Sequence, residues 1–321
     1  MEKEINFGGK HKIYGTLGMP NLEGTSPAVL LIAGSGPLDR DGNGSKGKFQ
    51  TNLYKDLAQY ITGLGFITLR YDKHGTGRRN QEDWLSAGLS DLTEDAITAV
   101  EFLRSHPNVD PEKIILAGHS EGVIIATKVA SSMKVGGVLF LSGGVDNLMQ
   151  ALEKQRRIMN EELFTKPFLG PILRKLKVAE KGEKQAAKFI DRCIRSQEDI
   201  IKVQLFFRQP AKWYREHAAC DTREALQDID CPILALVGDR DPLADGDVLS
   251  ELSTLAKGKT EYRIIPQMEH GLRVQYEERS ILKSGKRFKE IAKRPLHPEA
   301  LKDIKAWLHD NFQALEHEIA G

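Results

Sequence analysis

Hydrophobic and polar positions follow two patterns along most of the chain. Short apolar runs typical of buried strands are separated by segments in which apolar residues recur at helical spacing. The apolar runs fall at 5–7, 12–19, 28–33, 66–69, 113–117, 137–141, 232–237 and 262–265. The helical stripes fall at 53–64, 92–103, 123–128 and 298–312. The first two runs flank a Gly8-Gly9 turn and predict an antiparallel hairpin. The remainder predict an α/β fold, a mostly parallel, doubly wound sheet with helices on both faces.

The alternation is interrupted from about residue 145 to residue 228. This segment contains no convincing strand pattern, and its charged helical stretches are broken by Pro167, Gly170-Pro171 and Pro210. We expect residues 1–144 and 229–321 to form the core and residues 145–228 to form an inserted helical cap.

A motif that suggests nucleophilic catalysis follows the run at 113–117. The sequence Gly118-His119-Ser120-Glu121-Gly122 has the form Gly-x-Ser-x-Gly and lies between a predicted strand and a predicted helix. A sharp strand-to-helix turn lifts the serine side chain clear of the sheet, and the glycines remove Cβ atoms where strand and helix nearly touch. Ser120 is the candidate nucleophile, and the backbone N–H of Glu121, at the helix N-terminus, is a candidate oxyanion donor.

A serine nucleophile needs a base and an acid that orients the base. The strand at 232–237 is followed by Asp239 and Asp241, and the strand at 262–265 is followed by His270. Because parallel strands end at the same edge of a sheet, these side chains are expected near Ser120. Both aspartates qualify, and the chain order Ser, Asp, His is that of one specific triad architecture. The second oxyanion donor is expected in the glycine-rich loop that starts at Gly34.

Together these residues resemble the α/β-hydrolase superfamily, in particular its capped serine esterases. The segment 118–122 matches the nucleophile elbow of that family, and Glu269-His270-Gly271 matches its histidine loop. The resemblance implies that the acid is Asp241, because Gly238-Asp239-Arg240-Asp241 matches the family's Gly-x-x-Asp turn. It also implies that the N–H of Ser35 is the second oxyanion donor, with Gly36 as the alternative. The segments 34–41 and 70–77 are similar to bacterial acyl esterases grouped with serine aminopeptidases.

Composition excludes several other classes of protein. The chain has 321 residues, with 46 Lys plus Arg against 45 Asp plus Glu, a balance that does not favour nucleic-acid binding. The three cysteines show no CxxC spacing, so the sequence predicts neither disulfides nor a zinc site. No apolar window is long enough for a membrane span, and the N-terminus has no apolar leader segment. We expect a cytoplasmic protein, and the oligomeric state stays open.

Two loop motifs favour structural roles. Asp39-Arg40-Asp41-Gly42-Asn43-Gly44 fits half of a calcium loop, but Gln50 occupies the position of the bidentate acid. We expect Asp39, Arg40, Asp41 and Asp72 to form a charged network that braces the oxyanion loop. Gly75-Thr76-Gly77 lacks the rest of a dinucleotide fingerprint and is interpreted as a turn. The resemblance implies no metal and no organic cofactor.

The predicted cap is basic, with 16 Lys plus Arg and 9 Asp plus Glu in residues 151–220. Most of these charges are expected on a solvated surface. Leu205, Phe206, Phe207 and Trp213 are interpreted as an apolar lining for an acyl chain or as cap core. The expected function is hydrolysis of small-molecule acyl esters. A thioesterase, a serine aminopeptidase and a non-catalytic binding protein are the alternatives, and an aspartate nucleophile of the dehalogenase type is disfavoured because position 120 is serine.

Overall fold

The computed structural model describes residues 1–9, 11–44, 49–77, 83–204 and 206–313. Within these residues, eight strands form one sheet in the order β1-β2-β4-β3-β5-β6-β9-β10. The strands are β1 (Glu2–Phe7), β2 (Ile13–Gly18), β3 (Ser26–Ile32), β4 (Ile67–Tyr71), β5 (Val109–His119), β6 (Gly137–Leu141), β9 (Ile233–Gly238) and β10 (Thr260–Ile265). Strands β1 and β2 pair antiparallel, β2 pairs antiparallel with β4, and all later neighbours are parallel. The predicted hairpin and mostly parallel sheet are confirmed.

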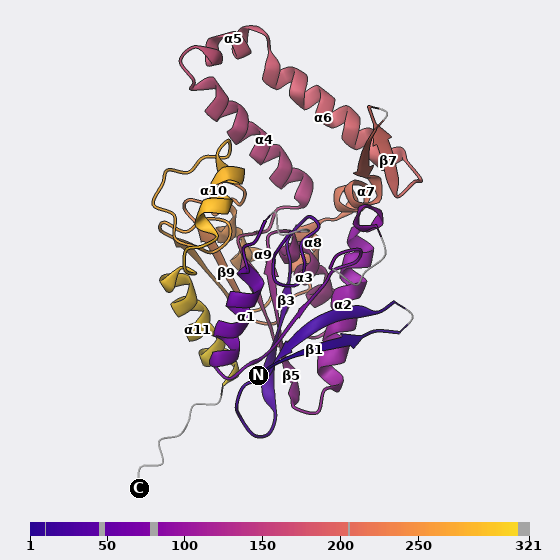
Figure 1. The fold of residues 1–321 in the computed structure, drawn as a ribbon, viewed down its shortest axis with the longest axis vertical. Helices are drawn as coiled ribbons and strands as arrows, with labels where there is room; N and C mark the ends of the chain where they lie inside the picture. Colours follow the sequence, from indigo (N-terminus) through magenta and orange to yellow (C-terminus); the bar gives the residue numbers. More distant parts are fainter. Residues whose placement is uncertain (10, 45–48, 78–82, 205, 314–321) are drawn as a thin grey trace.

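Helices cover both faces of the sheet (Figure 1). They bury the side chains that alternate along its strands. The helices around the sheet are α1 (Leu53–Gly63), α2 (Leu89–Ser105), α3 (Glu121–Ser132), α8 (Thr222–Leu226), α9 (Leu252–Leu255), α10 (Ser284–Ile291) and α11 (Pro298–Phe312), with the short 3-10 turns η2 (Trp84–Ser86) and η3 (Asp247–Glu251). One apolar layer packs α2 and α3 against the sheet, and the other packs α1 and α11 against its opposite face. Neighbouring residues of a strand such as Leu30 and Leu31 enter different layers, as the two-residue period of a strand requires.

The segment between β6 and β9 rises from one end of the sheet. It contains α4 (Leu148–Phe164), α5 (Leu169–Lys175), α6 (Val178–Arg195), β7 (Ile200–Val203), β8 (Phe207–Pro210) and α7 (Ala211–Ala219), followed by α8. Figure 1 shows α4 and α6 as a long arm, with α5 at its far end. The expectation of a strand-free segment is wrong, because β7 and β8 pair antiparallel. They are only four residues long each, too short for a periodic signal in the sequence.

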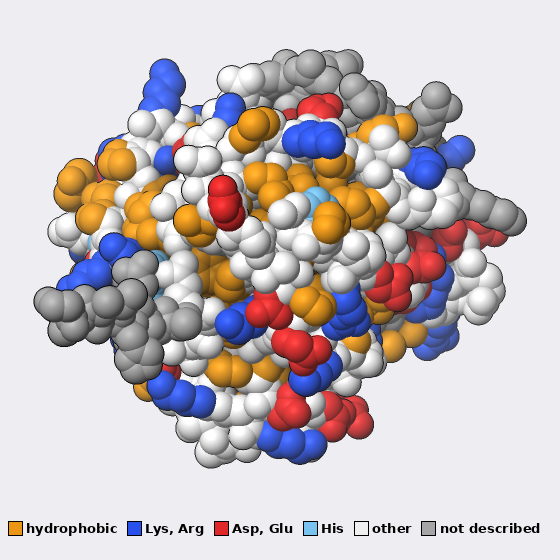
Figure 2. All heavy atoms as spheres, turned by 90° about the horizontal axis from the view of Figure 1, so that it is seen from below, with side chains coloured by type: hydrophobic (Ala, Val, Ile, Leu, Met, Phe, Trp, Pro, Cys, Tyr) orange, Lys and Arg blue, Asp and Glu red, His pale blue; other side chains and the backbone are white. Residues whose placement is uncertain are grey.

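The surface agrees with the balanced composition. On the face seen from below in Figure 2, acidic and basic side chains are interspersed and neither sign dominates. The three cysteines Cys193, Cys220 and Cys231 are buried free thiols. None of the helices that the structure describes combines the length and the hydropathy of a bilayer-crossing segment.

Candidate active site

Ser120 occupies the turn between β5 and α3. Its backbone has a positive φ of 56° with ψ −120°, a conformation that costs free energy for a residue with a side chain. A Cβ atom at Gly118 would overlap the carbonyl of Gly122, and one at Gly122 would overlap the carbonyl of Ile32. The two glycines thus allow the close approach of strand and helix that holds Ser120 in this turn. The predicted strand–turn–helix is confirmed.

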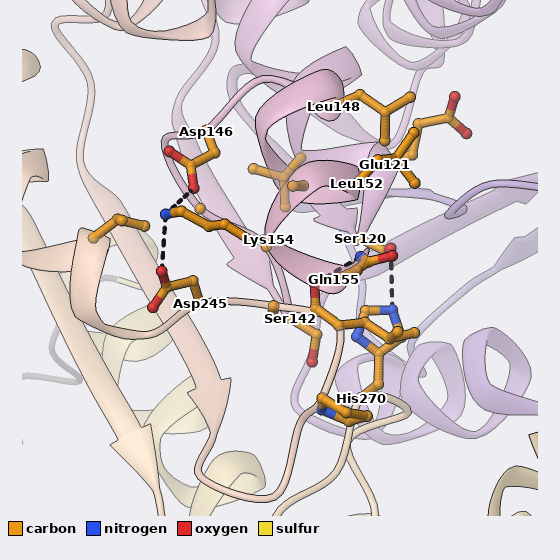
Figure 3. Close-up of a pocket in the computed structure, with 18 of the residues that line it drawn as sticks. Ser120, Glu121, Ser142, Asp146, Leu148, Leu152, Lys154, Gln155, Asp245 and His270 are labelled. Atoms are coloured by element: carbon orange, nitrogen blue, oxygen red, sulfur yellow. Dashed lines mark hydrogen bonds and ion pairs between the residues drawn. The ribbon is translucent and has the colours of Figure 1, made fainter. Parts of the chain in front are cut away.

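Ser120 and His270 meet at the carboxyl edge of the sheet (Figure 3). The Oγ atom of Ser120 lies 3.0 Å from Nε2 of His270, within hydrogen-bond distance. The other ring nitrogen, Nδ1, lies 2.8 Å from Oδ2 of Asp241. The structure therefore brings together the three side chains that the sequence indicated, although they are far apart in the chain.

The two candidate acids have different surroundings. Asp241 is fully buried, and its Oδ1 accepts hydrogen bonds from the backbone N–H groups of Leu243 (2.7 Å) and Ala244 (3.1 Å). Asp239 is exposed, and its Oδ1 accepts the N–H of Gln267 at 2.7 Å. Asp241 is thus held rigidly against His270, whereas Asp239 closes the turn before the histidine loop.

The charge of Asp241 changes the protonation of His270. Burial by itself lowers the pKa of the imidazole, but the Asp241 carboxylate stabilises the charged form more strongly. The pKa of His270 is therefore raised above its ordinary value. An imidazole with a raised pKa is a stronger base toward the Ser120 hydroxyl.

The candidate oxyanion donors differ in the cavities that they line. Ser35 and Glu121 both line the cavity that contains Ser120 and His270, whereas Gly36 lines only the neighbouring cavity. The N–H of Gly34 donates to the Tyr54 hydroxyl (2.8 Å), and the carbonyl of Gly34 accepts a hydrogen bond from Lys73. Because the N–H of Gly34 already donates to Tyr54, it is not free to bind an oxyanion. The hydrogen bonds at its N–H and at its carbonyl hold the loop in place. This arrangement favours Ser35 over Gly36.

A chain of hydrogen bonds that the sequence did not reveal joins the oxyanion loop to the histidine loop. The hydroxyl of Tyr54 accepts from Gly34 and lies 3.0 Å from Nδ1 of His119, whose Nε2 lies 2.8 Å from the carbonyl oxygen of His270. Because the Gly34 amide can only donate and the His270 carbonyl can only accept, Tyr54 donates to Nδ1 and the His119 proton is on Nε2. Burial lowers the pKa of His119 to about 3, so this neutral tautomer persists at ordinary pH. His119 lies inside the elbow motif, but no pattern in the sequence pointed to Tyr54.

The side chain of Glu121 is the centre of a second buried cluster. Its carboxylate accepts hydrogen bonds from Trp213 and His217 of α7 and lies 3.7 Å from the ammonium of Lys73. Burial by itself raises the pKa of Glu121, but Lys73 and His217 outweigh it and hold the pKa at about 2. The residue after the nucleophile thus connects the sheet edge to the inserted segment.

Two cavities flank this region. The first, of about 330 Å³, contains Ser120 and His270, with apolar walls from Leu148 and Leu152 (Figure 3). Val248 also lines it. Lys154 of α4 also lines this cavity, where Asp146 (2.6 Å) and Asp245 (2.8 Å) hold its ammonium group. The second cavity, of about 410 Å³, has an aromatic lining that includes Trp84, Trp213 and Tyr214. Ser35, Glu121 and Trp213 line both cavities.

The predicted apolar lining is correct only in part. Trp213 lines both cavities, but Phe206 and Phe207 are 83% and 64% exposed. Phe206 directly precedes β8 and Phe207 is its first residue, and their expected role as lining or core is wrong because both side chains face solvent. Leu205 lies outside the described residues.

The charged loop after β3 forms the predicted ion pairs, and its role in bracing the oxyanion loop stays a prediction. Arg40 pairs with Asp72 at 2.7 Å and Asp41 pairs with Arg70 at 2.7 Å. Asp39 accepts the N–H groups of Asp41 and Asn43 and closes the turn. The predicted network is confirmed, and its carboxylates are occupied by protein donors.

A different group has the spacing of metal ligands. The nearest ligand atoms of His11, His74 and Asp95 all lie within 4.8 Å of one another. The imidazoles of His11 and His74 stack, and His74 also lines the aromatic cavity. The group takes no part in the hydrogen-bonded chain of Ser120, His270 and Asp241.

Two curated proteins are similar to this chain in sequence. A curated relative, esterase EstD of Thermotoga maritima, is 25% identical over 240 residues, which is 75% of this chain and 52% of EstD. Polyketide transferase ATR5 of Stachybotrys chlorohalonatus is 26% identical over 152 residues, 46% of this chain and 51% of that protein. The chain thus spans about half the length of the curated relatives that it matches.

The fold matches that of a solved structure, and a family model covers most of the chain. Est1E of Butyrivibrio proteoclasticus, solved with ferulic acid, superposes with a TM-score of 0.57 at 16% identity, covering 89% of this chain and 96% of that one. The family model described as serine aminopeptidase, S33, matches residues 49–276, a range that includes Ser120, Asp241 and His270 but begins after the loop of Ser35. The chain belongs to the serine aminopeptidase S33 family and has the α/β-hydrolase fold.

Proposed function

We propose that this protein hydrolyses carboxylic esters through an acyl-enzyme on Ser120. The observation that carries the proposal is the continuous chain from the Ser120 hydroxyl through His270 to the buried Asp241, with distances of 3.0 Å and 2.8 Å. The name of the curated relative EstD, an esterase, supports the same reaction class.

In the proposed mechanism, His270 accepts the Ser120 proton as Oγ attacks the ester carbonyl carbon. The negative charge on the carbonyl oxygen is stabilised by the N–H groups of Ser35 and Glu121. His270 then returns the proton to the leaving alcohol as the carbon–oxygen bond breaks. Water, activated by the same imidazole, releases the acid and regenerates Ser120. Asp241 holds the ring and stabilises its cation in each step.

The two cavities suggest where each half of an ester binds. The leaving oxygen must approach Nε2 of His270 to receive its proton, and His270 lines only the first cavity. We assign the leaving alcohol to that cavity. The acyl group then extends past Ser35 into the aromatic cavity beside Trp84 and Trp213.

Residues 145–228 are proposed to form a cap that selects substrates without supplying the chemistry. Helix α4 lines the first cavity with Leu148 and Leu152, and α7 lines both cavities with Trp213. The proposed nucleophile, acid and base all come from outside the segment. A cap of this kind excludes water from the reacting atoms and adds contacts that distinguish substrates.

The test compares a p-nitrophenyl ester, a thioester with the same acyl group and an aminoacyl p-nitroanilide. We expect the ester to have the highest kcat/KM, and Ser120→Ala to lower its turnover on the order of a millionfold. A higher kcat/KM for the thioester or the anilide would reassign the substrate class within the same site. Undiminished hydrolysis by the Ser120→Ala protein would contradict the proposal.

A further inference from the structure

The far end of the arm formed by α4 and α6 exposes a cluster of large apolar side chains. Phe168 is 88% exposed, Leu169 47%, Ile172 55% and Leu176 53%, and we call these four residues the apolar tip. They lie on and beside α5, which Figure 1 shows as the part of the arm most distant from the sheet. Single exposed apolar residues are ordinary, but a contiguous group of this kind marks an interaction surface.

The rim of the apolar tip is mainly basic, with the carboxylate of Glu180 3.9 Å from the ammonium of Lys177. Lys166, Arg174, Lys175 and Lys177 are exposed around it, and residues 165–179 contain no acidic side chain. An apolar cluster with a basic rim is the arrangement that inserts into a lipid interface, where apolar side chains enter the acyl boundary and cations meet phosphate groups. Two copies of the chain placed tip to tip would bring like charges together, so the rim disfavours that occupant.

We propose that the apolar tip docks on a membrane surface that contains anionic lipid. The chain would lie on the membrane by this tip and would not cross it. Helix α4 connects the tip to the cavity of Ser120, and a helix of its 17 residues spans about 25 Å. Docking therefore leaves the candidate active site about one helix length from the lipid. The proposal is independent of the reaction at Ser120, because it rests on exposure and charge alone.

The experiment is flotation of the full-length protein with vesicles of phosphatidylcholine alone or with about 30% phosphatidylglycerol. We expect binding to the anionic vesicles to be at least about tenfold tighter than to the neutral ones, and to weaken as salt is raised. The double variant Phe168→Asp/Ile172→Asp should lose at least about tenfold in binding, because a charge at the insertion depth opposes entry into the acyl boundary. The matched control is Leu22→Asp, which changes an exposed leucine (62%) in the loop between β2 and β3 and should bind as the original protein does.

Circular dichroism confirms that each variant is folded before binding is measured. Absence of vesicle binding by the original protein would overturn the proposal, as would equal binding by the tip variant. A dimer in light scattering that dissociates in the tip variant, without vesicle binding, would assign the tip to a second copy of the chain and also overturn the proposal. Because the readout is binding, these outcomes are distinguishable from a failure of ester hydrolysis.

Discussion

The carboxyl edge of the sheet and the inserted segment hold their polar side chains in contrasting ways. At the sheet edge, Asp241, Glu121 and His270 are buried, and buried hydrogen bonds fix each of them. In the arm, pairs such as Arg195 with Asp191 and Arg157 with Glu161 lie on the exposed surface, where ion pairs contribute little. The difference indicates that the two regions have different roles. Catalysis requires fixed distances between the reacting groups, whereas substrate selection and surface contacts require only suitable side chains near the ligand.

The largest effect expected from this comparison concerns the two aspartates of one turn. Asp241→Asn should lower kcat by about four orders of magnitude, because an amide cannot hold the required His270 tautomer or stabilise its cation. Asp239→Asn, the matched control, should lower kcat less than about tenfold, since the Asp239 side chain pairs with the backbone of Gln267 and the side chain of Arg240 rather than with His270. The measurement is kcat on a p-nitrophenyl ester, and a reversed order would show that the acid is misassigned.

The next effect concerns the carboxylate that joins the two regions. Glu121→Gln leaves Lys73 and His217 without their buried partner and should lower the free energy of unfolding by about 3 kcal/mol at pH 7. Glu161→Gln, on the exposed arm, should change it by less than about 0.5 kcal/mol. Denaturant unfolding measures both changes.

The pKa of Glu121 adds a pH dependence to this prediction. The folded-state value of about 2 is below the ordinary 4.5, so the Glu121 contribution is present above pH 4.5 and is lost as the pH falls toward 2. The Glu121→Gln protein should lack that part of the acid destabilisation. Identical pH profiles for the two proteins would contradict the ionised, paired Glu121.

A moderate effect is expected on the pH dependence of hydrolysis. His270 must be neutral to accept the Ser120 proton, so kcat/KM should fall about tenfold per pH unit on the acid side. Because the pKa of His270 is raised, the midpoint of this limb should lie above 6.5 in the original protein. In Asp241→Asn the stabilising carboxylate is absent, and the residual activity should show a midpoint at lower pH. If the midpoint is the same in Asp241→Asn as in the original protein, the fall in kcat/KM at acid pH does not report the titration of His270.

The smallest effect tests the assignment of the two cavities. Leu152→Ala, in the wall of the first cavity, should change the preference among leaving alcohols by about tenfold at constant acyl group. Trp84→Ala, in the aromatic cavity only, should instead change the preference among acyl groups and the rate at which a given acyl-enzyme is hydrolysed. Steady-state and burst kinetics measure the two effects. If Leu152→Ala changed the acyl preference and Trp84→Ala changed the alcohol preference, the assignment of the two cavities would be reversed.

The sequence predicted the elements of the sheet edge because each has a local signal. Ser120 lies in a glycine-flanked turn, and Asp241 and His270 each follow an apolar strand, so topology alone brings them together. Gly118 and Gly122 are required because strand and helix approach closely there. This requirement is visible in the sequence as the Gly-x-Ser-x-Gly motif.

The parts that escaped prediction depend on tertiary contacts. Tyr54 reaches His119 across 65 residues, and His217 reaches Glu121 across 96, with no periodicity that links them. Phe206 and Phe207 face solvent beside a pair of strands that is too short to be recognised in the sequence. The apolar tip is exposed because the arm extends away from the sheet. Apolar side chains were assumed to be inside, and this rule fails where a segment leaves the core.

Peptide-mapping mass spectrometry after reaction with a fluorophosphonate tests whether Ser120 is the nucleophile. We expect one adduct, on the Oγ of Ser120, which disappears in Ser120→Ala. We also expect slow labelling in Asp241→Asn and ordinary labelling in Asp239→Asn. An adduct on another residue, or no adduct in the folded original protein, would show that Ser120 is not the nucleophile.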